Sequence, residues 1–143
     1  MQVIGFNLTK VLAERSPNFT RSAINTNIEF SNVEKEKVDL LKDAEAVKIS
    51  FKFSIIYEDR EKKDKKNGEV SCEGVIVLST SKEEAKDFHK SWKKKEVPKD
   101  TMIPLYNVIL KKCSVNALQL EDDLNLPPHI PFPQVRAQPP KDN

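Results

Sequence analysis

The sequence has little of several features that nucleotide-binding and membrane proteins depend on. It holds three glycines, two histidines and two cysteines in 143 residues. Three scattered glycines cannot build the glycine-rich loop that cradles a nucleotide phosphate. No run of apolar residues approaches the roughly 18 that a helix needs to span a bilayer. The sequence therefore argues against a nucleotide-binding loop and against insertion into a membrane.

The few residues suited to catalysis or metal binding lie apart in the sequence. Neither His89 nor His129 has a Cys, Asp or Glu at metal-ligand spacing, and we expect both rings to be exposed or partly packed. Cys72 and Cys113 are too few for a disulfide framework, so we expect two small buried apolar side chains. No signal brings a Ser or Cys nucleophile to either histidine. We therefore predict a binding protein that is not an enzyme and uses no metal or cofactor.

Charge is nearly balanced along the chain. Lys and Arg total 24 against 22 Asp and Glu, which gives a formal net charge of +2. A nucleic-acid-binding domain usually shows a larger and more clustered basic excess. The N-terminal residues lack the basic leader and the apolar run of a signal peptide. We therefore expect a cytoplasmic protein that binds no nucleic acid.

Alternation of apolar and polar residues predicts a sheet. The clearest strand is 47–55, where Val, Ile and Phe alternate with Lys and Ser. Other strands are predicted at 3–12, at about 28–30 after a polar break, and at 70–80. Between the last two long strands, the solvated loop 58–68 ends in an Asn-Gly pair, which favours a turn with positive φ. One-sided alternation is typical of an antiparallel sheet with one buried and one wet face.

Two helices are predicted after the last strand. Ser81 and Glu84 form a capping box that opens a short helix reaching about Ser91. Pro104 suits the first turn of a second helix, whose amphipathic stripe continues to about 122–123. The predicted fold class is therefore α+β, a four-stranded antiparallel sheet with one short and one long helix packed on one face.

A proline-rich stretch follows the second helix. Its prolines exclude a helix or a central strand, so the chain is extended or disordered there. The part 124–133 carries four large apolar side chains on this stiff backbone, whereas 134–143 is polar. Two interpretations of 124–133 stay open, a strap over its own domain and a mobile apolar flap beside a groove.

Three segments resemble those of a known family. Cys72-Glu73 lies in the last long strand, Ile103-Pro104 opens the second helix, and 124–132 reads Leu-Asn-Leu-Pro-Pro-His-Ile-Pro-Phe. In this order, and with the strands before them, they resemble the SecB family of protein-export chaperones. The resemblance covers about residues 3–133, as a pattern more than as identity.

The resemblance implies a single SecB-like chaperone domain over 1–133, followed by a polar, proline-containing C-terminal tail over 134–143. It implies an ATP-independent holdase that binds unfolded or nascent polypeptides in an apolar groove and assembles as a homotetramer, a dimer of dimers. The client-binding residues that it implies are Leu124, Leu126, Ile130 and Phe132. The oligomer-interface residues that it implies are Leu105, Val108, Ile109 and Lys112.

Two departures from the family bear on protein export. The second C-terminal helix expected after Phe132 is replaced by 133–143, and the chain lacks an acidic tail and a net negative charge. Both features weaken the case for docking to the protein-translocation machinery. Two alternative functions stay open: an adaptor chaperone for one specific folded partner, such as a toxin–antitoxin component, and a carrier of a small apolar ligand.

Overall fold

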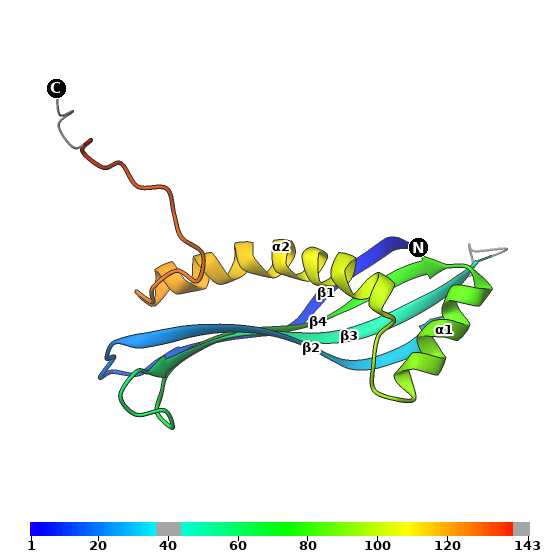
Figure 1. The fold of residues 1–143 in the computed structure, drawn as a ribbon, viewed down its shortest axis with the longest axis horizontal. Coiled ribbons are helices and arrows are strands. Elements are labelled where there is room, and N and C mark those ends of the chain that lie inside the picture. The colour runs from blue at the N-terminus through cyan, green and yellow to red at the C-terminus, as the bar shows by residue number, and fades with distance from the viewer. Residues whose placement is uncertain (37–43, 139–143) are drawn as a thin grey trace.

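The computed structural model of the chain describes residues 1–36 and 44–138. All strand pairs are antiparallel, and the order across the sheet is β1-β4-β3-β2 (Figure 1). The predicted α+β class with a four-stranded antiparallel sheet is confirmed. In chain order the elements are β1 (Gln2–Arg15), β2 (Ser22–Glu36), β3 (Glu45–Asp59), β4 (Lys66–Thr80), α1 (Lys82–Trp92) and α2 (Lys99–Asp123).

The strands are amphipathic in the way that the alternation predicts. Strand β3 buries Ile49, Phe51 and Phe53 completely, while Ser50 and Lys52 between them stay partly exposed on the opposite face. The helices cover only the buried face of the sheet. The opposite face stays open within one chain, and it also carries the partly exposed Ile56, Val75 and Val77.

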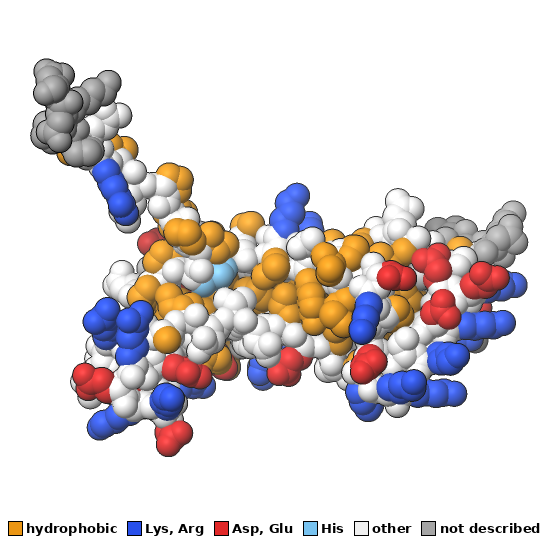
Figure 2. Space-filling model, in the orientation of Figure 1, with side chains coloured by type: hydrophobic (Ala, Val, Ile, Leu, Met, Phe, Trp, Pro, Cys, Tyr) orange, Lys and Arg blue, Asp and Glu red, His pale blue; other side chains and the backbone are white. Residues whose placement is uncertain are grey.

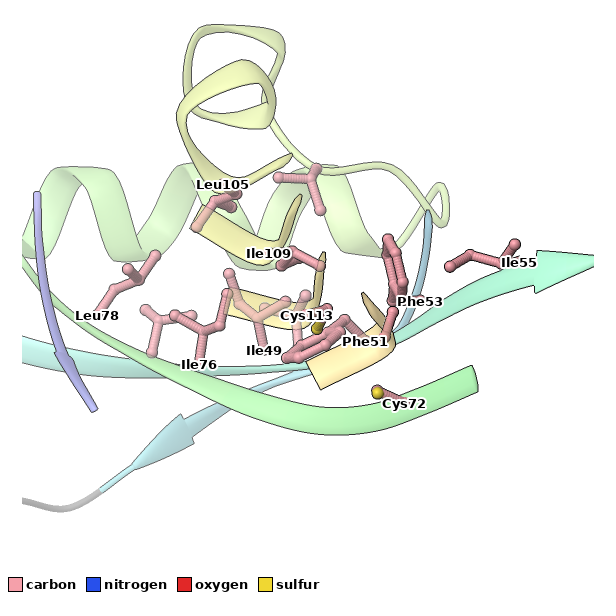
Figure 3. Packing of buried hydrophobic residues seen from close by; sticks show 14 of the residues in the cluster. Ile49, Phe51, Phe53, Ile55, Cys72, Ile76, Leu78, Leu105, Ile109 and Cys113 are labelled. Atoms are coloured by element: carbon pink, nitrogen blue, oxygen red, sulfur yellow. The ribbon is translucent and has the colours of Figure 1, made fainter. Parts of the chain in front are cut away.

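The core lies between that face and the helices. Side chains of the sheet and of both helices form one buried cluster, part of which is drawn in Figure 3. Burying each large apolar side chain contributes roughly 1.5–3 kcal/mol, so this cluster holds the two layers together. From the sheet come Ile49, Phe51, Phe53, Ile76 and Leu78, from α1 Ala85 and Phe88, and from α2 Leu105, Ile109 and Cys113.

Strand β2 is much longer than predicted. It spans Ser22–Glu36 rather than 28–30, and its polar stretch pairs regularly with β3. The prediction was wrong because β2 lies at the edge of the sheet, with one face open to solvent. Asn25 and Asn27 pair with Ile56 and Ser54 of β3, on the face that the helices leave uncovered.

The turn between β3 and β4 also differs from the prediction. The Asn-Gly pair lies inside β4, and none of the described glycines has a positive φ. The Asp59 carboxylate accepts hydrogen bonds from the Thr20 hydroxyl at 2.5 Å and from the amides of Glu61 and Lys62 at 2.8 and 3.0 Å. These bonds, that of Thr20 first, lower the pKa of Asp59 to about 2. A side-chain acceptor therefore forms this turn, as Asp residues often do.

One predicted helix start is confirmed and the other is wrong. The capping box of α1 is present, with Ser81 and Glu84 each accepting a hydrogen bond from the other's amide. Helix α2 begins at Lys99, so that Pro104 lies inside it. The Pro98 carbonyl accepts hydrogen bonds from the amides of Thr101 and Met102, in a turn that forms ahead of Pro104. Because Pro104 has no N–H, one helical hydrogen bond is missing there.

Among the described residues, no helix is long and apolar enough to cross a membrane.

Gly74 of β4 lies where the structure leaves no space for a side chain. A Cβ there meets the Asn7 carbonyl oxygen at 2.5 Å and Cζ of Phe51 at 2.9 Å. We expect Gly74→Ala to lower the free energy of unfolding by about 1–3 kcal/mol, because β1 or the Phe51 ring must move. Gly5→Ala in the same strand pair is the control, since its Cβ meets Val77 at an ordinary 3.4 Å. Urea unfolding compares the two variants, and equal midpoints would contradict the prediction.

Candidate functional site

A groove runs between edge strand β2 and helix α2. It consists of two adjoining hollows, of about 380 and 570 Å³, whose linings share Thr26 and Leu110. Figure 2 shows hydrophobic side chains gathered in a band along α2, above β2. We call this site the β2–α2 groove; its lining is Thr26, Asn27, Ile28, Tyr106, Leu110, Lys111, Ser114, Val115, Leu118, His129 and Ile130.

The groove is apolar surface that the chain itself leaves uncovered. Leu110 is 38% exposed and Ile130 is 40% exposed. The Tyr106 ring of α2 stacks on the Phe30 ring of β2, with 5.3 Å between centroids, which ties the helix to the edge strand. Exposed apolar surface of this kind marks binding sites in folded proteins.

The segment after α2 folds back and closes one end of the groove. Asn125 has a φ of 53°, the left-handed conformation that commonly ends a helix and reverses the chain. The Leu126 amide then donates to the Glu121 carbonyl at 2.8 Å, and the Leu126 side chain is buried in the core. Ile130 is thereby placed on the groove wall, while Phe132 beyond it is 59% exposed. Residues 124–130 thus form a strap over the domain.

A buried polar cluster holds this strap. The Glu121 and His129 side chains are 1% and 4% exposed, and Nδ1 of His129 lies 2.5 Å from Oε1 of Glu121. Nε2 of His129 lies 3.1 Å from the Ser114 hydroxyl, and the His129 amide donates to Oε2 of Glu121 at 3.3 Å. The Tyr57 hydroxyl donates to the Pro127 carbonyl at 2.6 Å. Burial, and then the negative charge of Glu121, raise the pKa of Tyr57 well above its usual range.

The contacts of His129 with Ser114 on one side and Glu121 on the other are those of a Ser-His-Glu hydrolase triad. The sequence showed no sign of a nucleophile beside a histidine. Acyl transfer also needs N–H donors for the developing oxyanion. Ser114 is inside α2, where backbone N–H groups donate to carbonyls four residues earlier and are not free for this role. We therefore interpret the cluster as a structural lock on the strap. The expectation that His129 is exposed or only partly packed was wrong, since its imidazole is buried and paired.

The residues expected at an oligomer interface divide into two groups. Leu105 and Ile109 are fully buried against the sheet, so within one chain they form the core and offer no surface to a second chain. Val108 is half-buried and Lys112 is exposed, and their interface role stays a prediction. The apolar side chains that α2 exposes most strongly are instead Ile103 and Val115.

Of the four residues expected to bind a client, the structure places one in the groove lining. This residue is Ile130, whereas Leu126 is in the core and Leu124 is packed against it. The sequence did not identify the groove residues of β2, because their stretch reads as a polar break. The spacing of Tyr106 and Leu110, four residues apart beside the core stripe of α2, was the signal that could have revealed the helical wall.

Leu126 and Phe132 are expected to differ sharply when truncated. Leu126→Ala should lower the free energy of unfolding by about 2–5 kcal/mol, because it leaves a cavity next to Tyr57 and Gly68. Phe132→Ala should change it by less than about 0.5 kcal/mol, because its side chain is mostly in solvent. Urea unfolding of both variants measures the difference, and a large effect of Phe132→Ala would show that the strap extends further than residue 130.

Comparison with known proteins identifies the fold. No family model and no curated protein matches the sequence. Among solved structures, the chain is similar to the Mycobacterium tuberculosis Rv1957 SecB-like chaperone, solved in complex with a ChAD peptide from the Rv1956 HigA1 antitoxin. The TM-score is 0.50 at 14% sequence identity, and the match covers 96% of this chain and 92% of that one. The resemblance identified in the sequence is confirmed at the level of structure: this chain has the fold of a SecB-like chaperone.

Proposed function

We propose that this chain is an ATP-independent chaperone that holds unfolded or nascent polypeptides in the β2–α2 groove. The observation that carries the proposal is the pair of adjoining hollows of the β2–α2 groove, with Leu110 and Ile130 uncovered, in a SecB-like fold. Each apolar client side chain buried there contributes roughly 1.5–3 kcal/mol before the cost of ordering. Many weak contacts along an open surface allow different sequences to bind.

Suppression of aggregation tests this function directly. A chemically unfolded model enzyme is diluted into buffer with and without the purified chain, and light scattering is followed without ATP. We expect the chain at a few-fold excess to reduce the scattering strongly, with no further change when ATP is added. Unchanged scattering at several-fold excess would contradict the proposal.

We further propose that residues 1–133 form the chaperone domain and that it acts in the cytoplasm as a homo-oligomer, a dimer of dimers. Support comes from apolar side chains that stay exposed outside the groove, such as Ile4 and Val11 of β1, because exposed apolar surface favours contact with a second chain. Multi-angle light scattering should give four times the mass of the 16.3 kDa chain. A monomer at micromolar concentration would contradict this assembly. A link to protein translocation is weaker, because a net charge of +2 offers no excess of acidic surface.

A second candidate function is an adaptor for one partner. It is favoured by the similar Rv1957 chaperone, which was solved with a peptide from an antitoxin. Pull-down from a native lysate separates the two functions, since an adaptor retains one stoichiometric partner and a holdase retains many. A carrier of a small apolar ligand is less favoured, because the groove is open along α2 whereas such carriers bury most of their ligand.

A further inference from the structure

The floor of the groove includes the backbone of edge strand β2. Thr26 and Ile28 pair with Ile55 and Phe53 and face the helices, whereas Asn27 pairs with Ser54 and faces the other side. Asn27 nevertheless lines the groove, so it contributes through its backbone. Within the described residues β2 pairs only with β3, and every second residue of such an edge points its N–H and C=O groups away from the sheet.

This part of the edge lacks the usual protection against pairing with another strand. Proteins commonly blunt an edge with charges, prolines or bulges. The stretch 22–28 contains no charged residue and no proline, and it pairs with β3 without a register shift. The one shift in this pair lies further along, between Phe30 and Asn32. The other edge strand, β1, has two shifts, one near its start between Val3 and Gly5 and one at its middle between Leu8 and Lys10.

The unprotected edge and the apolar wall coincide. A strand added beside 22–28 places every second side chain on the helix-facing side of the sheet, about 6.6 Å apart. Tyr106, Leu110 and Ile130 line the groove on that side. Backbone hydrogen bonds then supply affinity that does not depend on sequence, and the groove selects apolar residues at alternate positions.

We propose that a client binds as an extended segment that adds a fifth strand to the sheet along 22–28, with alternate apolar side chains in the β2–α2 groove. The proposal rests on the proposed function and specifies its client. The bound segment is an unfolded stretch of about five to seven residues that is apolar at every second position. On the edge that faces β2, its backbone N–H groups must be free to donate hydrogen bonds.

Three peptides with the same order of side chains test the mode of binding. The probe is a fluorescein-labelled Lys-Leu-Thr-Phe-Thr-Leu-Thr-Leu-Lys, compared with two isomers that each carry three N-methyl groups: one at the amides of its Phe and its last two Leu residues, the other at the amides of its three Thr residues. Because alternate amides of a strand point to opposite edges, one isomer turns its methyl groups towards β2 and the other towards solvent. We expect one isomer to lose at least tenfold in affinity by fluorescence anisotropy, while the other binds within about threefold of the parent.

Each other outcome overturns a defined part of the proposal. Equal affinity of all three peptides overturns strand addition and leaves groove binding standing. Failure of the parent peptide to bind overturns strand addition, and only the aggregation assay then decides the proposed function. Equal loss for both isomers also overturns it, because a single edge cannot contact both sets of amides.

Amide hydrogen exchange on the unmodified protein gives a second readout. With the parent peptide bound, alternate amides within 22–28 should exchange at least tenfold more slowly than in the free protein. The edge of β1 (Gln2–Arg15) is the internal control and should not change. Protection of β1 alone, or protection confined to α2, would overturn pairing with β2.

Discussion

Replacing His129 by alanine is expected to lower the free energy of unfolding by about 3 kcal/mol. Among the polar side chains of the strap, we expect this substitution to have the largest effect on stability. The change leaves the Glu121 carboxylate 1% exposed without its imidazole partner, and it leaves the Ser114 hydroxyl without Nε2. Removing one partner of a buried pair is costly because the remaining group stays desolvated. Urea unfolding at neutral pH measures the loss.

A double-mutant cycle separates the lock from ordinary packing. In Glu121→Leu/His129→Leu no charge remains buried, so this variant should be more stable than His129→Leu alone. His89→Ala is the control, because Nε2 of that ring is buried without a hydrogen-bond partner among the described residues. We expect His89→Ala to change stability by less than about 1 kcal/mol. Equal losses for His129→Ala and His89→Ala would show that the Glu121–His129 contact contributes nothing.

Placing a carboxylate in the groove is expected to lower affinity for unfolded polypeptide at least tenfold. Leu110→Asp is the variant, because Leu110 borders both hollows of the groove. A bound apolar client would desolvate the new charge, which costs more than the 1.4 kcal/mol that corresponds to a tenfold change. Stability should fall little, since Leu110 is already 38% exposed. Fluorescence anisotropy with a labelled unfolded protein and the aggregation assay both report the loss.

Ile103→Asp is the matched control for Leu110→Asp. It makes the same kind of change on the same helix, at a residue that is 68% exposed and not part of the groove lining. We expect its client binding to stay within about threefold of that of the unchanged chain. If Ile103→Asp lowers client binding as strongly as Leu110→Asp, the client surface is the outer side of α2 rather than the groove. Light scattering on both variants shows whether a change in assembly accompanies the loss.

The sequence by itself determined the fold class and most of the order of the elements. The alternation at 47–55 predicted β3 because its side chains face a core on one side and solvent on the other, which is a local pattern. The start of α1 was predicted because Ser81 and Glu84 contact each other within one turn. The prolines after residue 126 likewise excluded a further helix over 127–133, and the structure has none there.

The site was decided by tertiary structure alone. Strand β2 is polar in the stretch that forms the groove, and it is a strand because it pairs with β3 at the edge of the sheet, so only the paired sheet reveals it. Glu121 and His129 meet because the chain reverses at Asn125 and brings two polar residues into one buried place. Composition and periodicity predict which face of a single helix or strand is buried. A groove lies between elements, so they cannot predict it. The sequence therefore predicted the layers of this protein, and the placement of α2 beside edge strand β2 decided where it offers apolar surface.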